Sequence, residues 1–331
     1  MDERILTENP RRQVFSRIGW AFTAILVITS VLQILLAVVP ALIWGEDNFV
    51  TGTTWGMWLV TFVPMYLVAV PVGLRILKPL PLCPPQDRGL KLDKLLALLP
   101  ISYCVMYAGN LIGTVLSLQL SGGEAENVVV EYAMDDSALK ILFMVILAPL
   151  LEEYICRKQI IDRTRCYGEK TAVVLSALVF GLLHQNFYQF FYAFGLGLVF
   201  AYVYLRTGRL RYTVILHAIV NFMGSVLAPW VLNNVDVTML DTMDPNISSE
   251  EFLALYGEAI PGLVIAGGYI LLLLGLAVAG LVLLIVNLRK LTWLPAERQL
   301  PRGTAARTVY LNWGMGVYIL LCLISCALAL L

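Results

Sequence analysis

The sequence predicts an all-α fold, a polytopic membrane helical bundle of about nine transmembrane helices, with eight as the alternative count. Three observations predict it. Of the 331 residues, 59% are hydrophobic and only 14% are charged, and the mean hydropathy is +0.80; soluble domains are roughly 45–50% apolar and about 25% charged. Apolar runs of about 20 residues, the length that crosses a bilayer, recur along the chain. Charged residues concentrate between these runs.

The expected spans follow one another with mostly short connections. They are residues 18–44, 55–77, 95–120, 139–161, 171–185, 188–205, 212–232, 261–288 and 309–331. The first run is too long for the apolar region of a signal peptide and no small-residue cleavage site follows it, so we interpret it as a true helix. The fifth span is short and almost no loop separates it from the sixth, which predicts a tight hairpin.

We divide the chain into a cytoplasmic N-terminal tail (1–17) and a single membrane domain (18–331), since no repeat or soluble domain is evident. Within it, residues 137–232 form the expected four-helix core. The six cysteines show no CxxC spacing, so we expect neither a disulfide framework nor a structural zinc site. Cys322 and Cys326 lie one helical turn apart and are interpreted as packing residues.

Basic residues alternate between successive connections. The N-terminal tail and the even-numbered connections hold 22 of the 23 Lys and Arg residues, and the exception, Lys140, lies at a helix end. Residues 45–54, 121–136 and 233–260 hold no basic residue and several acidic ones. The positive-inside rule then places the N-terminus in the cytoplasm and the C-terminus outside. The pattern favours a bacterial plasma membrane, and the zero net charge gives no indication of nucleic-acid binding.

Ionisable residues within membrane spans are costly and mark candidate functional sites. Glu152 and Glu153 follow an apolar run, His184 ends the fifth span, and His217 and Asn221 lie in the seventh. The protein has only two histidines, and both fall inside these spans. This coincidence predicts that the polar residues meet at one site, because either histidine alone is as consistent with packing as with function.

Helical spacing divides the acidic residues into two roles. Glu153 and Arg157 are four residues apart, so they share a face and can form an ion pair. Glu152 is rotated by about 100° from Glu153 and is left free of that pair. At a helix end, the Glu153–Arg157 pair by itself is most often structural. An unpaired Glu152 beside it is harder to explain by structure alone.

The remaining candidates also share faces. Phe180 lies one turn before His184 and can cover it with apolar surface. His217 and Asn221 are four residues apart, so one helix can direct both at a single point. The plain alternative for Asn221 is a hydrogen bond to a neighbouring helix. The aromatic residues between 187 and 192 are interpreted as an interfacial belt or as hairpin packing.

A carboxylate, two imidazoles and an amide suit hydrolysis of a peptide bond. A carboxylate can take a proton from water, and imidazole and amide N–H groups can stabilise an oxyanion. A GxSxG-type serine motif, which a serine mechanism would need, is absent from the sequence.

The polar residues fall into three motifs on separate expected helices. They are EExxxR from Glu152 to Arg157, FxxxH from Phe180 to His184, and HxxxN from His217 to Asn221. In this order and spacing they resemble the signature of the CPBP intramembrane proteases, also called the Abi family, which are related to the type II CAAX prenyl proteases. The resemblance covers residues 139–225. The first three spans and the last two have no motif to compare.

The resemblance implies an intramembrane endopeptidase that acts on a membrane-associated protein or peptide, in CAAX-type or in bacteriocin and peptide processing. Glu152 would activate water and His184 would help to hold it. His217 and Asn221 would form the oxyanion site.

A second layer of residues, which would contact these four but not the substrate, would consist of Glu153, Arg157 and Phe180. Family members are often labelled metalloproteases, and a bound zinc ion would take Glu152, His184 and His217 as ligands. In that arrangement Glu153 would have to be the base, although Arg157 already shares its face. We therefore expect Glu152 to activate water directly, without a metal.

Two other functional classes remain as alternatives. A transporter would need polar residues on more helices and broken helices in symmetric positions, and no such symmetry is evident. A non-catalytic immunity or binding protein of the same family would keep the same motifs.

Overall fold

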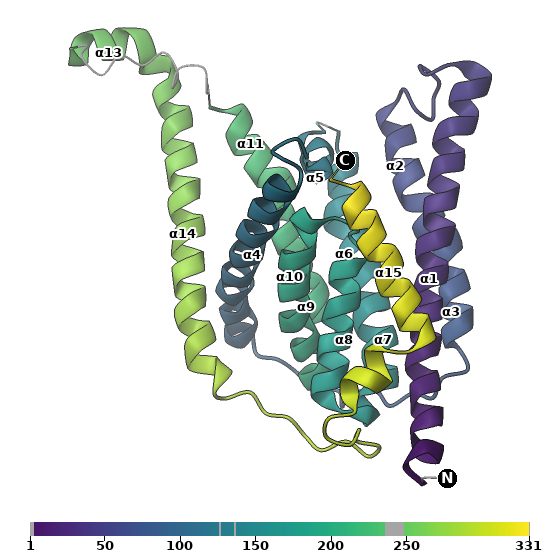
Figure 1. Cartoon of the computed structure of the whole chain (residues 1–331). Helices are drawn as coiled ribbons and strands as arrows, with labels where there is room; N and C mark the ends of the chain where they lie inside the picture. The colour runs from purple at the N-terminus through teal and green to yellow at the C-terminus, as the bar shows by residue number, and fades with distance from the viewer. Residues whose placement is uncertain (1–2, 126, 136, 236–247, 331) are drawn as a thin grey trace.

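The computed structural model describes residues 3–125, 127–135, 137–235 and 248–330, and in these ranges every regular element is helical. Long helices run side by side through the molecule (Figure 1). Six helices in the described ranges are long and apolar enough to cross a membrane. The fold is therefore that of an integral, multi-pass helical membrane protein, as predicted. The count of about nine spans stays a prediction.

The first third of the chain forms three long helical rods. Their elements are α1 (Glu3–Trp44), α2 (Thr54–Phe62), η1 (Val63–Ala69), α3 (Val70–Leu77) and α4 (Leu92–Leu120). The chain from α2 to α3 is continuous and makes the second rod. Because α1 begins at Glu3, most of the predicted N-terminal tail is a helical extension of the first span. A short helix, α5 (Val128–Met134), follows α4.

The middle of the chain supplies the expected four-helix core. Its elements are η2 (Ile141–Leu147), α6 (Ala148–Glu153), η3 (Tyr154–Gln159), α7 (Ile160–Thr164), η4 (Arg165–Tyr167), α8 (Glu169–Leu182), α9 (Phe187–Thr207), α10 (Leu210–Phe222), η5 (Met223–Leu227) and α11 (Ala228–Asn233). The chain from η2 to α7 is one continuous rod, the fourth. The connection between α8 and α9 is only four residues long, which confirms the predicted hairpin.

The last part of the chain covers the two sides of this core. Its elements are α13 (Ser249–Tyr256), η6 (Gly257–Ala259), α14 (Ile260–Leu288), η7 (Ala306–Tyr310) and α15 (Trp313–Leu328). Helix α14 packs on α4 at one edge (Figure 1), and few of its residues are buried in the described structure. Helix α15 packs on α1, where Gly19 and Gly314 face each other so closely that neither position has room for a Cβ atom.

Three π-helical turns in the rods precede a proline, whereas a fourth, η3, does not. The turns η1, η2 and η5 are followed by Pro71, Pro149 and Pro229 at the second residue of the next helix. Proline has no N–H to donate and its ring crowds the carbonyl one turn earlier. A turn widened by one residue accommodates that ring.

The buried side chains form layers around the α8–α9 hairpin. Residues of α1, α3 and α15 pack on one side, against α8 and the η3–α7 part of the fourth rod. Residues of α4 and α10 pack on the other, against α9. Gly109 and Gly113 let the backbone of α4 come close to the first turns of α9. This packing holds α6, α8 and α10 around a common centre.

The chain begins and ends at opposite ends of the bundle. The first turns of α1 and the last turns of α15 lie at the lower and upper ends in Figure 1, as an odd number of crossings predicts. At the lower end Cys83 donates its backbone N–H to Asp162 O, and the connection after α14 donates from Arg298 N to Cys166 O at 2.8 Å. Which end faces the cytoplasm stays a prediction.

Candidate active site

Glu153 and Arg157 form the ion pair that their spacing predicts. The guanidinium donates from Nε to Glu153 Oε2 at 2.9 Å and from Nη2 to Oε1 at 3.1 Å, and both side chains are fully buried. Arg157 also donates to Ser176 Oγ at 3.2 Å. Its charge lies 4.4 Å from the centre of the Phe180 ring. The guanidinium is thus held on several sides, as a buried charge requires.

His217 continues this chain of contacts from α10. Its Nδ1 lies 3.2 Å from Glu153 Oε1, and its Nε2 lies 3.8 Å from Glu152 Oε2. The rings of Phe180 and Phe200 pack against the imidazole. Since a carboxylate only accepts hydrogen bonds, Nδ1 carries the hydrogen and Nε2 is turned toward Glu152.

Glu152 lies outside the Arg157 pair, also as predicted. Its Oε1 accepts a hydrogen bond from the hydroxyl of Tyr66 in η1 at 3.1 Å. Its side chain keeps 18% of its surface exposed, whereas that of Glu153 keeps none. Of the two acidic residues, only Glu152 therefore has exposed surface.

His184 lies in the turn that joins α8 to α9. Its Nδ1 donates to the carbonyl oxygen of Phe180 at 2.9 Å, which leaves Nε2 free, and the Phe180 ring meets it edge-on. The next residue, Gln185, has a φ angle of 57°, which is unusual for a residue other than glycine. Asn186 holds this turn by donating to His184 O at 2.7 Å and by accepting from Gln189 N.

Asn221 lies one turn beyond His217, and its amide is partly used by the protein. Nδ2 donates to Met144 O at 2.8 Å. Hydrogen bonds in a π turn join residues five apart, and at the end of η2 the N–H of Ala148 donates to Phe143 O. By the same spacing, the partner of the next carbonyl, Met144 O, would be the nitrogen of Pro149. Proline has no hydrogen there, so Asn221 satisfies the orphaned carbonyl. One amide hydrogen remains for other contacts.

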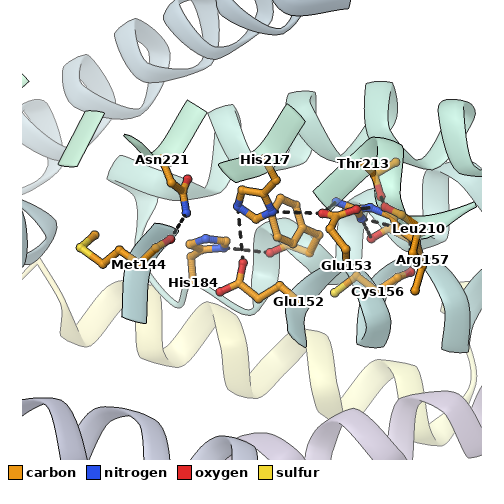
Figure 2. A network of polar contacts seen from close by, with 12 residues as sticks. Met144, Glu152, Glu153, Cys156, Arg157, His184, Leu210, Thr213, His217 and Asn221 are labelled. Carbon is orange, nitrogen blue, oxygen red and sulfur yellow. Dashed lines mark hydrogen bonds and ion pairs between the residues drawn. The ribbon is translucent and has the colours of Figure 1, made fainter. Parts of the chain in front are cut away.

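Figure 2 shows how these residues converge. His217 lies between Asn221 and Glu153, with Glu152 and His184 below it. They come from α6, from the α8–α9 turn and from α10. The structure thus brings together every residue that the three motifs predict for the site.

Sequence reasoning misses several residues around the site. Tyr66 contacts Glu152 from the second rod, where a lone tyrosine in an apolar run gives no signal. The sequence places Tyr192 in an interfacial belt or in packing, yet its ring lies 6.4 Å from that of His184 and its hydroxyl accepts from Gln189. Ser176 is missed as well. The only sequence feature that could indicate it is its position one helical turn before Phe180.

The donor set does not fit a metal ion as it is arranged. Glu152, His184 and His217 are the predicted ligands of a zinc ion, with bond lengths of about 2.0–2.2 Å. Within the described ranges, no three His, Cys, Asp or Glu residues are grouped so that they could hold a metal. We therefore derive no chemical step through a metal.

The fold and the cluster define a class of protein: an integral helical membrane protein with a half-buried carboxylate, two imidazoles and an amide gathered between its helices. Residues 135–223, which include all of the predicted site residues, match the family described as type II CAAX prenyl endopeptidase Rce1-like. Tyr66 lies outside the matched segment.

A second comparison agrees with the first. The chain is 36% identical over 100 residues to the membrane-embedded CAAX protease MroQ of Staphylococcus aureus (strain USA300). This match covers 28% of the chain and 40% of the relative, so it spans less than half of the relative's length. No solved structure matches the chain. These findings confirm the predicted resemblance to the CAAX protease family, and the matched segment points to a membrane protease.

Proposed function

We propose that this protein is an intramembrane endopeptidase that hydrolyses a peptide bond through a water molecule activated by Glu152. One observation carries the proposal: the partly exposed carboxylate of Glu152 lies beside two imidazoles and an amide within the segment that matches a protease family. A transporter is not favoured by either comparison.

Glu152 acts as the general base. The Tyr66 hydroxyl occupies Oε1, which leaves Oε2 to accept a proton from water. The resulting hydroxide attacks the carbonyl carbon of the substrate. Glu152 then gives the proton to the leaving nitrogen as the peptide bond breaks, so the carboxylate is regenerated in each cycle.

The two histidines and Asn221 act on the water and on the oxyanion. The neutral His184 ring carries its hydrogen on Nδ1, so Nε2 can accept a hydrogen bond from the attacking water. Asn221 has one amide hydrogen left to offer the oxyanion. His217 can add a second donor from Nε2 when its ring is protonated.

Glu153 and Arg157 position His217 without touching the substrate. Glu153 orients the His217 ring through Nδ1, and Arg157 holds Glu153 in place from the other side. A fully buried carboxylate with two partners is poorly placed to reach water.

The substrate class follows from where the site lies. A site among membrane helices acts on substrates that are themselves held at the bilayer. The matched family is described as a prenyl endopeptidase and the relative is named a CAAX protease. We propose a lipid-modified CAAX-type protein or peptide as the substrate. Unmodified peptide precursors are the second candidate.

The test uses the purified full chain in lipid vesicles. A peptide that ends in a prenylated CAAX sequence is compared with the same peptide without the prenyl group, and products are identified by mass. We expect the wild type to cleave the prenylated peptide faster. Glu46→Gln, which removes an exposed acid far from the site, is the matched control and should cleave equally. Failure of a folded wild-type protein to cleave either peptide would favour the non-catalytic role.

A further inference from the structure

A shallow, largely open cavity of about 350 Å³ lies toward the lower end of the bundle, and none of the predicted site residues lines it. It lies between α3, the connection after α3 and the lower half of the fourth rod. Three basic side chains line it, those of Arg75, Lys78 and Arg163. This is the end of the molecule where the predicted cytoplasmic connections gather.

Arg163 is built into the wall of this cavity. Its side chain is 8% exposed, its Nε donates to Leu77 O at 3.2 Å, and its Nη1 donates to both the backbone and the side-chain oxygen of Gln159. No described residue accepts a hydrogen bond from Nη2. A buried guanidinium held rigidly with one edge free is pre-organised to bind an anion.

None of the three cations forms a salt bridge with an acidic residue in the part of the chain that the structure describes. The ion pairs at this end of the bundle join other residues: Lys158 with Asp162, Arg206 with Glu169, and Arg209 with Asp87. The nearest acid, Asp162, follows Gln159 on the same rod and is paired with Lys158. One carboxylate shared among these cations leaves the cluster with a net positive charge, which attracts an anion.

The rest of the cavity wall is apolar or amphipathic. Leu74 and Leu82 contribute hydrocarbon surface, and Leu82 is 62% exposed. Tyr154 adds an aromatic ring with a hydroxyl, a side chain typical of the bilayer interface. A ligand that matches this surface needs an anionic group for the cations and hydrocarbon for the leucines.

We propose that this cavity binds the phosphate of an anionic phospholipid from the leaflet at the basic end of the protein. Arg163, Arg75 on α3 and Lys78 directly after α3 hold the phosphate, and the leucines contact the upper part of an acyl chain. Anionic lipids of the cytoplasmic leaflet attract basic clusters beside membrane spans. The site is separate from the proposed peptidase chemistry, and its occupancy can be measured without any activity.

The test measures retained lipid by native mass spectrometry. The full chain is purified from mixed phosphatidylcholine and phosphatidylglycerol, and the ratio of the two bound lipids is compared between variants. Wild type should retain phosphatidylglycerol preferentially. Arg75→Gln and Lys78→Gln should each lower that preference about fivefold, since one cation near the surface contributes about that factor. Both residues are exposed and, among the described residues, neither side chain has a hydrogen-bond or ion-pair partner, so the variants should fold.

The matched control removes the same charge elsewhere at the same end. Arg289 and Lys290 are exposed, lie outside the cavity and make no side-chain contact in the described structure. Arg289→Gln and Lys290→Gln should leave the lipid ratio unchanged. An equal fall in all four variants would show a diffuse charge effect and overturn the proposal. So would a wild-type protein that retains the two lipids equally.

Two further measurements distinguish the phospholipid from other ligands that carry an anionic group. If inorganic phosphate raises the thermal stability of the protein in phosphatidylcholine as much as phosphatidylglycerol does, the site takes a soluble phosphate and the lipid assignment is wrong. If Arg75→Gln instead raises the KM for a peptide with a free C-terminal carboxylate, but not for its amidated form, and leaves lipid retention unchanged, the cavity binds the substrate and the proposal fails.

Discussion

Glu152 and Glu153 are adjacent in the sequence but lie in opposite surroundings. Glu153 is fully buried and is shared by Arg157 and His217, whereas Glu152 keeps an exposed edge and a single hydroxyl donor. The helix produces this difference because neighbouring residues point about 100° apart. Two neighbouring glutamates can therefore differ in role: one holds the structure together, and the other is available for chemistry.

Replacing Glu153 by Gln should lower stability more than it changes chemistry. Arg157 would remain buried without a counter-charge, and breaking a buried pair in this way costs about 3–5 kcal/mol. Thermal unfolding of the purified Glu153→Gln variant in detergent measures the loss. A variant as stable as Glu46→Gln would show that the pair is not what holds these helices.

Asn221 has a structural partner as well as a proposed chemical role. Asn221→Ala should lower the rate by about 10²–10³, the cost of one oxyanion donor, and should also leave Met144 O unpaired at about 1–3 kcal/mol. Pro149→Ala restores a backbone N–H that can reach this carbonyl. In the double variant Pro149→Ala/Asn221→Ala, unfolding measurements should therefore recover stability while the rate stays low. Recovery of both would assign Asn221 a purely structural role.

The motifs predict the site residues because each motif follows the helical repeat. Spacings of three and four residues place side chains on one face, so the Glu153–Arg157 pair and the place of Phe180 beside His184 follow from the spacing alone. The contact between Tyr66 and Glu152 does not, since it depends on how the second rod packs against the fourth. The Asn221–Met144 bond depends on a π turn, which no local spacing indicates.

At the scale of elements, the apolar runs predict each of the long rods, and proline explains three of the places where the rods deviate from regular helices. Three π turns precede prolines, and one of them creates the orphaned carbonyl beside the site. The start of α1 is predicted less well: the charged residues before the first apolar run suggest a tail, but they continue the same helix. Polar residues can extend a helix beyond the membrane, so hydropathy marks the span rather than the helix.

The connection after α3 offers a direct test of topology. Hydrogen bonds from the thiol and the backbone N–H of Cys166 lower the pKa of Cys83 to about 7, so its reaction with a maleimide should increase as the pH rises through about 7, below the range of an ordinary thiol. A membrane-impermeant maleimide should label Cys83 only from the cytoplasmic side. Glu46→Cys, in a Cys83→Ser background, should be labelled only from the outside. The opposite result would reverse the predicted orientation.

At the scale of the whole molecule, the core and its flanks have different tasks. The α8–α9 hairpin, the fourth rod and α10 bring the polar residues together, while α1, α15, α4 and α14 enclose them and face lipid. Only the core carries motifs, so only its role could be predicted from the sequence. The basic cavity at the lower end could not, because it forms where α3 and the fourth rod pack side by side and no local pattern indicates that contact.

The metal content of the purified protein is a second property of the whole molecule. We expect activity that survives a strong chelator, because the three candidate ligands are not grouped as a metal site in the described ranges. Elemental analysis of the active protein, with and without chelator, measures this directly. Stoichiometric zinc, together with activity lost to the chelator and restored by zinc, would instead make Glu152, His184 and His217 its ligands.

The central claim is that Glu152 activates the attacking water. Its most direct test compares the rate of peptide cleavage by Glu152→Gln and wild type in vesicles, at matched thermal stability. The amide keeps the shape of the side chain but cannot take a proton from water. The account predicts that cleavage by Glu152→Gln falls to background while its unfolding temperature stays close to that of the wild type. Cleavage at the wild-type rate by a folded Glu152→Gln protein would contradict it.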